Sequence, residues 1–297
     1  MTKNVSASVH ARLLNRAREK GLLFNELLQH FALERWLYRL SRSNFSNRLI
    51  LKGGLLLVAR DFPISRSTRD VDLLADLSND LEAVRETIAE ICGADVEEDG
   101  LSFPPGTVKT QRIAKDAMYE GVRATFHGAL GTAKISMQID LGFSDVVTPP
   151  PEELVYPTLL DFPPAVLRVY PMETVLAEKF QSMTKLGGLN SRMKDYFDVW
   201  ILASTTDFDA ARLTAAIHGT FERRETPLAE AVAHLDMAAR GELQLQSQWD
   251  RFLKGGSLTG SAPKDFSKIC EGIDAFLGAL IRQKLSNHKW SASEGWN

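Results

Sequence analysis

Two hydrophobic periods divide the chain into a part with strands and a part made of helices. From Val108 to Ser144 apolar and polar residues alternate, and residues 121–130 and 133–143 are predicted to form two antiparallel strands. One face of the second strand carries Ile135, Met137, Ile139 and Leu141, and the other carries Ser136, Gln138 and Asp140. Since side chains alternate along a strand, this strand has one apolar face for a core and one polar face with an aspartate near its end.

The segments before this hairpin predict two helices, followed by short strands and further helices. Residues 8–20 and 25–41 have apolar residues at helical spacing, and the second stripe is broad enough that we expect Trp36 to lie in the core. Residues 48–52 form a short apolar run, typical of a buried strand. Helices are then expected over 54–60 and 81–92, with a strand around Asp70 between them.

Beyond a proline-rich stretch the pattern is almost entirely helical. The expected helices are 172–186, 192–203, 207–224, 228–240, 244–254 and 265–286, and residues 290–297 are expected to form a loose tail. Prolines at 149–151 and between 157 and 164 favour a connection. We therefore expect an α+β chain with two domains, 1–150 with the strands and 165–297 as a helical domain.

Composition places the chain among ordinary globular proteins and excludes several classes. Hydrophobic residues make up 44% and charged residues 25% of 297. No run approaches the roughly 18 apolar residues of a membrane span, and residues 1–20 are too charged for a signal peptide. Cys92 and Cys270 lie far apart without CxxC spacing, which fits a reducing compartment and no zinc site. We expect a cytoplasmic monomer with no membrane partner.

The charges are distributed unevenly along the first hundred residues. Residues 1–52 hold ten basic and three acidic side chains, whereas residues 61–99 hold twelve acidic and three basic ones. A basic arm beside an acidic centre suits an enzyme that binds a polyanion. Arg12 and Arg16, four apart on the first predicted helix, are expected to share a phosphate-contacting face. Solvated helix faces are the alternative interpretation of the same charges.

A glycine pair followed by two aspartates is the most informative pattern in the chain. Gly53 and Gly54 follow the first predicted strand, and Asp70 and Asp72 stand on the next one. The two carboxylates point the same way and repel by about 4 kcal/mol at ~4 Å and an effective dielectric near 20, which favours a divalent cation between them. The glycines allow the backbone to approach a phosphate closely. For Asp-x-Asp alone, a solvated surface pair is the competing interpretation.

A second group of charged residues lies in the helical half. Asp195 and Asp198 are three apart and share a helix face, and Lys179 stands among apolar residues of another helix. A lysine in such a position suits a triphosphate or a leaving pyrophosphate, and a surface lysine is the alternative. Arg66 and Arg69 flank the loop before the two aspartates and are candidates for phosphate contacts.

Read together, six segments resemble one protein family. They are FALERWLYRLSRS, LKGGLLL, STRDVDLL, MQIDLGFSD, PMETVLAEKFQSM and SRMKDYFDVW, and they occur in this order from about Phe31 to Trp200. The chain resembles the AbiEii/MenT-type nucleotidyltransferase toxins of bacterial toxin–antitoxin and phage-defence systems, within the DNA polymerase β-like nucleotidyltransferases. The resemblance implies a polymerase β-like core with a mixed sheet, followed by a C-terminal helical bundle.

The resemblance also implies a function and a role for each candidate residue. It implies a transferase that adds nucleotides from a nucleoside triphosphate, with Mg²⁺ or Mn²⁺, to the 3′ end of tRNA and so blocks translation, with a cognate antitoxin as a possible partner. Asp70, Asp72 and Asp140 would be metal ligands and catalytic, with Lys179, Asp195 and Asp198 as the later catalytic residues. The nucleotide would contact Gly53, Gly54, Lys52, Arg66, Arg69 and Lys179.

Two other functions remain open from the sequence. One is a nucleotidyl- or phosphotransferase that acts on a hydroxyl of a partner protein. The other is a binding module without catalysis, against which the intact Asp70, Asp72 and Lys179 argue. There is no GxxxxGK[ST] loop, no GxSxG elbow and no HExxH spacing, which excludes the enzyme classes that need them.

Overall fold

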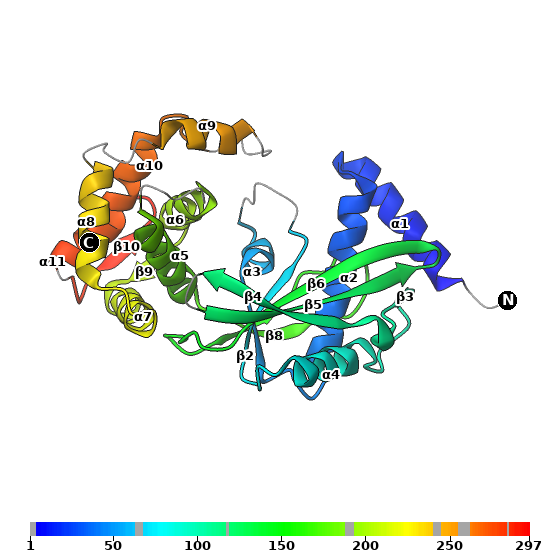
Figure 1. Cartoon of the computed structure of the whole chain (residues 1–297). Coiled ribbons are helices and arrows are strands. Elements are labelled where there is room, and N and C mark those ends of the chain that lie inside the picture. Colours follow the sequence, from blue (N-terminus) through cyan, green and yellow to red (C-terminus); the bar gives the residue numbers. More distant parts are fainter. Residues whose placement is uncertain are drawn as a thin grey trace. The chain divides into compact units, whose positions relative to one another are not determined.

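A computed structural model describes residues 4–62, 68–116, 119–187, 193–239, 245–254, 262–283 and 285–297, without the side chains of 114–116, 119, 120 and 239. Arg66 and Arg192 therefore lie outside the described residues. In the described part, no helix is both long and apolar enough to cross a bilayer. The chain divides into two compact units (Figure 1).

Unit 1 comprises Met1–Asp61, Ser67–Ser144 and Glu152–Val169 and is built on one mixed sheet. The strand order is β3-β5-β6-β2-β1-β8-β7, with β4 paired to β5. The strands are β1 (Leu49–Lys52), β2 (Val71–Ala75), β3 (Leu101–Ser102), β4 (Lys109–Asp116), β5 (Tyr119–Leu130), β6 (Ala133–Gly142), β7 (Glu152–Val155) and β8 (Val166–Val169). Because β2 runs parallel to β6 and antiparallel to β1, the expected mixed sheet is confirmed.

Four helices accompany this sheet. They are α1 (Val5–Lys20), α2 (Phe24–Ser41), α3 (Gly54–Ala59) and α4 (Leu81–Cys92), with the short 3₁₀ turn η1 (Pro105–Thr107) before β4. Helix α2 packs against α4, β6 and β8, and its broad apolar stripe explains why Trp36 is fully buried, as expected. The apolar face of β6 is buried with it, which leaves Ser136, Gln138 and Asp140 on the other face of the sheet.

Helix α2 also carries a buried charged network of Glu34, Arg35, Arg39 and Asp99. Asp99 accepts hydrogen bonds from Arg35 Nε at 3.1 Å and from Arg39 Nη1 at 2.7 Å. Its other oxygen accepts from Arg39 Nη2 at 3.1 Å and from the backbone N–H of Leu101 at 3.0 Å. Burial alone would raise the pKa of Asp99, but the bonds and charges of the arginines outweigh it and lower this pKa. The network combines two acids with two bases, and each of them is at most 6% exposed.

This network corrects the expectation of a basic N-terminal arm that is free to bind a polyanion. Arg35 and Arg39 are buried and bonded to Asp99. Arg12 lies 5.3 Å from the centre of the Phe162 ring and 4.0 Å from a carboxylate oxygen of Asp161. The half-buried Arg16 has an enclosed Nε. Several arginines of the expected basic arm therefore contribute to packing within unit 1. The excess of basic residues in the sequence gave no information about where their acidic partners lie.

Unit 2 comprises Phe62–Arg66, Asp145–Pro151 and Tyr170–Asn297. Its helices are α5 (Met172–Leu186), α6 (Met193–Thr205), α7 (Ala210–Arg223), α8 (Leu228–Ala239), α9 (Gln246–Lys254), α10 (Phe266–Ile273), the π-helical turn η3 (Asp274–Gly278) and α11 (Ala279–Gln283). The expected C-terminal helices are thus present. A small antiparallel sheet joins β9 (Phe208–Asp209), β10 (Lys289–Ser291) and β11 (Gly295–Trp296).

Two segments fold differently from the sequence-based expectation. The C-terminal tail is not loose: Trp290 and Trp296 pack on Phe276, and their indole N–H groups donate to the carbonyls of Ala203 and Phe276. The proline-rich stretch contains β7 and β8, which return to the sheet of unit 1. The domain limits 1–150 and 165–297 stay predictions about folding units, which a division by packing does not test.

Candidate active site

Four charged residues form a row across neighbouring strands of the unit 1 sheet. Lys52 on β1 is the cross-strand partner of Asp72 on β2, which is the partner of Asp140 on β6, which is the partner of Arg123 on β5. Partners on adjacent strands point to the same face of a sheet and have Cβ atoms roughly 5 Å apart. We call Lys52, Asp72, Asp140 and Arg123 the charged row. The strand register alone brings these four residues together from three separate stretches of sequence.

Asp70 extends this row at the start of β2. It precedes the strand directly and lies two residues before Asp72. The pKa of Arg123 is raised, most strongly by its hydrogen bond to Asp140, and the charges of Asp70 and Asp72 add to the shift. All three carboxylates therefore raise the pKa of the same guanidinium, so all three lie in the neighbourhood of Arg123. With Asp70 included, three acids face two bases.

The glycine pair lies directly against these acids. Gly53 has φ +73°, a conformation that side chains other than glycine rarely adopt, and it precedes the first residue of α3. A Cβ added to Gly53 would come within 2.8 Å of the Cβ of Asp72, and one added to Gly54 within 2.7 Å of Thr68 Oγ1. Both the backbone conformation and the lack of space therefore require glycine here, and the backbone of Gly53 borders the Asp72 carboxylate.

Asp140 is held firmly by Arg123, a residue that the sequence reasoning missed. Arg123 Nε donates to Asp140 Oδ1 at 2.8 Å and Nη2 donates to Oδ2 at 2.9 Å, and the Asp140 side chain is only 4% exposed. Such a two-pronged pair is geometrically specific. Gln138, with its amide oxygen turned toward Arg123, accepts from Nη2 at 3.2 Å. Pairing the alternation of β5 with that of β6 in the predicted hairpin would have placed Arg123 on this polar face.

The donor set at this position fits one hard cation better than two. Asp70 and Asp72 supply carboxylate oxygens, the ligands that Mg²⁺ and Mn²⁺ prefer. Both oxygens of Asp140 are engaged by Arg123, so Asp140 would have to exchange this partner to become a third ligand. In the described part of the chain, no group of three or more His, Cys, Asp or Glu side chains is arranged to hold a metal ion. The role of Asp140 as a metal ligand stays a prediction.

Unit 2 brings together the second group of predicted residues, which we call the lysine cluster. Lys179 on α5 bonds Asp198 on α6, and its Nζ lies 3.7 Å from Asp195 Oδ1. Burial acts to lower the pKa of Lys179, but the charges of Asp198 and Asp195 and the bond to Asp198 outweigh it, so this pKa is raised. The lysine is thus a protonated, largely buried cation with one more acid than base around it.

Other charged residues near the lysine cluster were not predicted. Arg224, which follows α7, donates from Nη2 to Asp145 at 2.9 Å and lies 3.3 Å from Glu178, the neighbour of Lys179 in sequence. Arg224 Nη1 also donates to Gln181 at 3.0 Å. These contacts join Arg224 to the residues on either side of Lys179 in α5. No local spacing rule links Arg224 to a helix more than forty residues earlier, so the sequence offered no signal for it.

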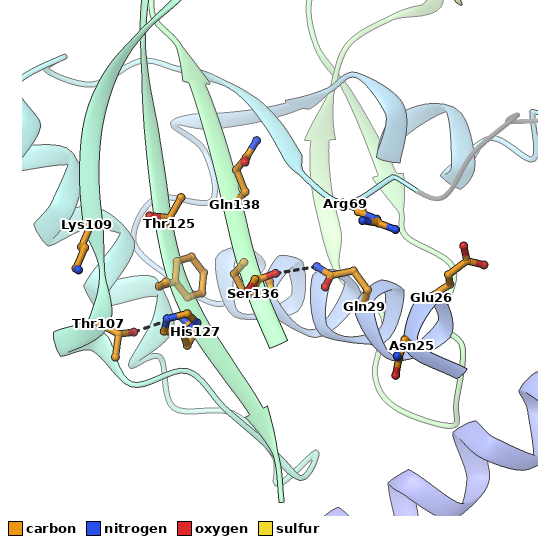
Figure 2. A pocket seen from close by; sticks show the side chains of 12 residues that line it. Asn25, Glu26, Gln29, Arg69, Thr107, Lys109, Thr125, His127, Ser136 and Gln138 are labelled. Atoms are coloured by element: carbon orange, nitrogen blue, oxygen red, sulfur yellow. Dashed lines mark hydrogen bonds between the residues drawn. The ribbon is translucent and has the colours of Figure 1, made fainter. Parts of the chain in front are cut away.

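A polar cleft of about 920 Å³ opens on unit 1 beside the charged row. Figure 2 shows its polar lining: Asn25, Glu26, Gln29, Arg69, Thr107, Lys109, Thr125, His127, Ser136 and Gln138. Gln29 Nε2 donates to the carbonyl of Ser136 at 3.1 Å, and the backbone N–H of His127 donates to Thr107 Oγ1 at 3.3 Å. The predicted nucleotide-binding residue Arg69 is exposed and belongs to this lining, whereas Lys52 is only 8% exposed.

A mixed sheet with a glycine pair and clustered acids, followed by a helical region, defines the class of the nucleotidyltransferases. The sequence matches the family model "Nucleotidyl transferase AbiEii toxin, Type IV TA system" over residues 35–277. The chain therefore belongs to the AbiEii nucleotidyltransferase toxin family, and it is an enzyme of that class. The family resemblance inferred from the sequence motifs is confirmed.

One solved structure supports the fold of the chain. JHP933 from Helicobacter pylori aligns over 87% of this chain and 92% of its own, with a TM-score of 0.51 and 16% identity. A putative nucleotidyltransferase from H. pylori aligns over 87% of this chain and 95% of its own, with a TM-score of 0.48 and 14% identity. At this identity the first likeness concerns the fold alone. No curated protein matches the chain.

Proposed function

We propose that this enzyme transfers nucleotides from a nucleoside triphosphate to the 3′ end of a tRNA and thereby blocks translation, as the toxin of a bacterial toxin–antitoxin or phage-defence system. The observation that carries the proposal is the position of Gly53 against Asp72 inside the charged row. A backbone segment without a side chain, bordered by carboxylates, gives a triphosphate and its cation a place to lie together.

Each residue has a role that follows from its position. Asp70 and Asp72 would hold Mg²⁺ or Mn²⁺, which when bound neutralises charge on the triphosphate and stabilises in-line displacement at the α-phosphorus. Lys52 is buried opposite Asp72, which suits orienting this carboxylate better than reaching a phosphate. Arg69 is exposed and suits a phosphate contact. Arg123 holds Asp140 in a fixed orientation at the edge of the site through two hydrogen bonds.

The lysine cluster supplies the second half of the proposal. Asp195 and Asp198 keep Lys179 protonated, and a positioned ammonium stabilises negative charge that develops in a transition state. We assign to Lys179 the role of stabilising the negative charge on the departing pyrophosphate. In the transfer itself, the oxygen of the acceptor hydroxyl bonds to the α-phosphorus. The bond from that phosphorus to the pyrophosphate oxygen breaks, and one of the site's aspartates accepts the hydroxyl proton.

The test is to incubate the purified protein with each α-labelled triphosphate, Mg²⁺, total tRNA and a bacterial lysate cleared of nucleic acid. The proposal expects label in tRNA, lost after Asp72→Asn. Label that appears in a protein and not in tRNA would assign the enzyme to a partner-protein acceptor. Absence of label from every acceptor, while a relative of known activity works in the same assay, would reject transferase activity toward both. A neighbouring antitoxin gene would be tested by co-expression, which should restore growth.

A further inference from the structure

The polar cleft continues from the charged row along the same sheet face. On β6 the residues that share a face are Lys134, Ser136, Gln138 and Asp140, so the cleft residues Ser136 and Gln138 follow Asp140 in sequence steps of two. On β5, Arg123, Thr125 and His127 follow the same order, and Thr125 pairs with Gln138. From Asp140 to Ser136 the strand spans roughly 13 Å. The cleft residues therefore lie on the same sheet face as Asp140 and extend from Gln138 away from the acids.

The chemistry of the lining changes along this face. The acids of the charged row are accompanied by the two bases Lys52 and Arg123. The cleft is lined instead by amides, hydroxyls, Arg69, Lys109 and His127, with Glu26 as the single acid among the described residues of its lining. Amides and hydroxyls hydrogen-bond the edges of unpaired bases, and cations contact phosphates. Lys109 is exposed and Thr125, its partner on β5, is exposed beside it. Figure 2 shows Lys109 and Thr125 on the two neighbouring strands.

The order of the strands places the cleft and the glycine pair on opposite sides of Asp72. The glycine pair and Lys52 lie on the β1 side of Asp72, and the cleft lies on the β6, β5 and β4 side. In-line displacement at a phosphorus needs the attacking hydroxyl and the leaving pyrophosphate on opposite sides. A triphosphate over the glycines therefore leaves the cleft side for the attacking hydroxyl.

From this geometry we propose that the polar cleft binds the single-stranded 3′ end of the acceptor RNA, with the terminal hydroxyl directed toward Asp70 and Asp72 and the preceding nucleotides along Gln138 and Ser136. The inference rests on the proposed function, because it supplies the site for that reaction's second substrate. It also replaces the N-terminal helix as the candidate RNA surface, since Arg12 has partners within unit 1.

A crosslinking experiment on the full chain tests the location directly. The probe is a short single-stranded RNA whose 3′-terminal residue is 4-thiouridine, used without triphosphate and mapped by mass spectrometry after irradiation. The proposal expects crosslinks in peptides containing residues 107–111 or 134–138, which carry the cleft residues of η1, β4 and β6. Crosslinks confined to α1, or to any part of unit 2, would overturn it.

A matched pair of variants gives an independent readout. Lys109→Glu combined with Ser136→Glu changes two exposed positions, so the fold should persist. RNA affinity, measured by fluorescence anisotropy, should fall roughly tenfold or more with a weaker salt dependence, because a phosphate contact is lost and acids are added. Affinity for the Mg²⁺-triphosphate should change by less than about twofold. Lys289→Glu, which makes the same charge reversal as Lys109→Glu on an exposed residue of β10, should leave both affinities within about twofold.

The outcomes separate this inference from the proposed function. Transfer of nucleotides to tRNA together with unchanged RNA affinity in the double variant would refute the cleft and leave the function standing. Crosslinks in the cleft without any transfer to RNA would support the cleft and refute the function. Equal loss of RNA affinity in the double variant and in Lys289→Glu would show nonspecific charge attraction and count against the cleft.

Discussion

Unit 1 contains two charged clusters of similar composition and opposite character. The buried network of Glu34, Arg35, Arg39 and Asp99 has as many acids as bases, and it is closed to solvent. The charged row with Asp70 has more acids than bases, and Asp70 and Asp72 are only half-buried beside the cleft residues Arg69 and Gln138. The comparison teaches that residue types do not distinguish a structural cluster from a functional one. An unbalanced charge with access to solvent does, because only such a cluster gains by taking up a cation.

The largest effect that sharpens this comparison is expected for Asp72→Asn. Nucleotide transfer should fall by at least about a thousandfold, which is about 4 kcal/mol of barrier, because a cation ligand is lost. Stability should change by less than about 1 kcal/mol, because the relief of repulsion among Asp70, Asp72 and Asp140 offsets the loss of the carboxylate opposite the buried Lys52. Single-turnover transfer and urea unfolding measure the two quantities. Transfer near the wild-type rate would refute the assignment of the row.

The matched change in the buried network is Asp99→Asn, and its effect should fall on stability. It removes the carboxylate charge that is bonded to the buried guanidinium groups of both Arg35 and Arg39, which should cost about 3 kcal/mol. The transfer rate per folded molecule should remain close to that of the wild type. A urea titration and an assay at low temperature check both points. Loss of activity without loss of stability would erase the distinction between the two clusters.

The lysine cluster of unit 2 extends the comparison, since it is unbalanced like the charged row. Lys179→Met should lower transfer by about a hundredfold, because one positioned charge is lost from the reaction. Lys185→Met, on the same helix but exposed, serves as the control and should change transfer by less than about twofold. Rapid-quench kinetics at saturating triphosphate separate the rate from binding. Equal effects of the two substitutions would remove Lys179 from the mechanism.

The smallest effect concerns pH and again the buried network. Burial raises the pKa of Glu34 to about 7, so the folded state holds a proton that the unfolded state releases near the ordinary value of 4.5. The stabilising contribution of that proton is fully present below about pH 4.5 and is lost as the pH rises through about 7. The wild type should thus lose roughly 1 to 3 kcal/mol relative to Glu34→Gln between these limits. Parallel pH dependences in urea unfolding would contradict the shift.

Much of unit 1 could be predicted from local patterns. The alternation of residues 133–143 placed Asp140 on a polar face, and the glycine pair with Asp70 and Asp72 marked the site, because these signals lie within single strands and turns. Arg123 was missed because its role depends on the register between two strands. Strand β7 and strand β8 were missed because they are short and lie among prolines.

The remaining features could not be predicted from the sequence because they depend on the burial of charged residues and on pairing between residues far apart in the chain. Arg35 and Arg39 follow the helical pattern of solvated residues, yet their partner Asp99 lies about sixty positions away. The tail at 290–297 lacks a strand pattern of its own, and its two indoles are ordered by contacts with Phe276, a residue outside the tail. Such contacts arise from tertiary packing, which no window of sequence contains.

Binding of Mn²⁺, followed by electron paramagnetic resonance with a nonhydrolysable triphosphate present, tests the central claim most directly. The account predicts that wild type and Asp99→Asn bind the ion with affinities within about threefold of each other, and that Asp72→Asn loses at least about tenfold. Undiminished Mn²⁺ affinity in folded Asp72→Asn would contradict it, since the charged row would then not be where the cation and the nucleotide bind.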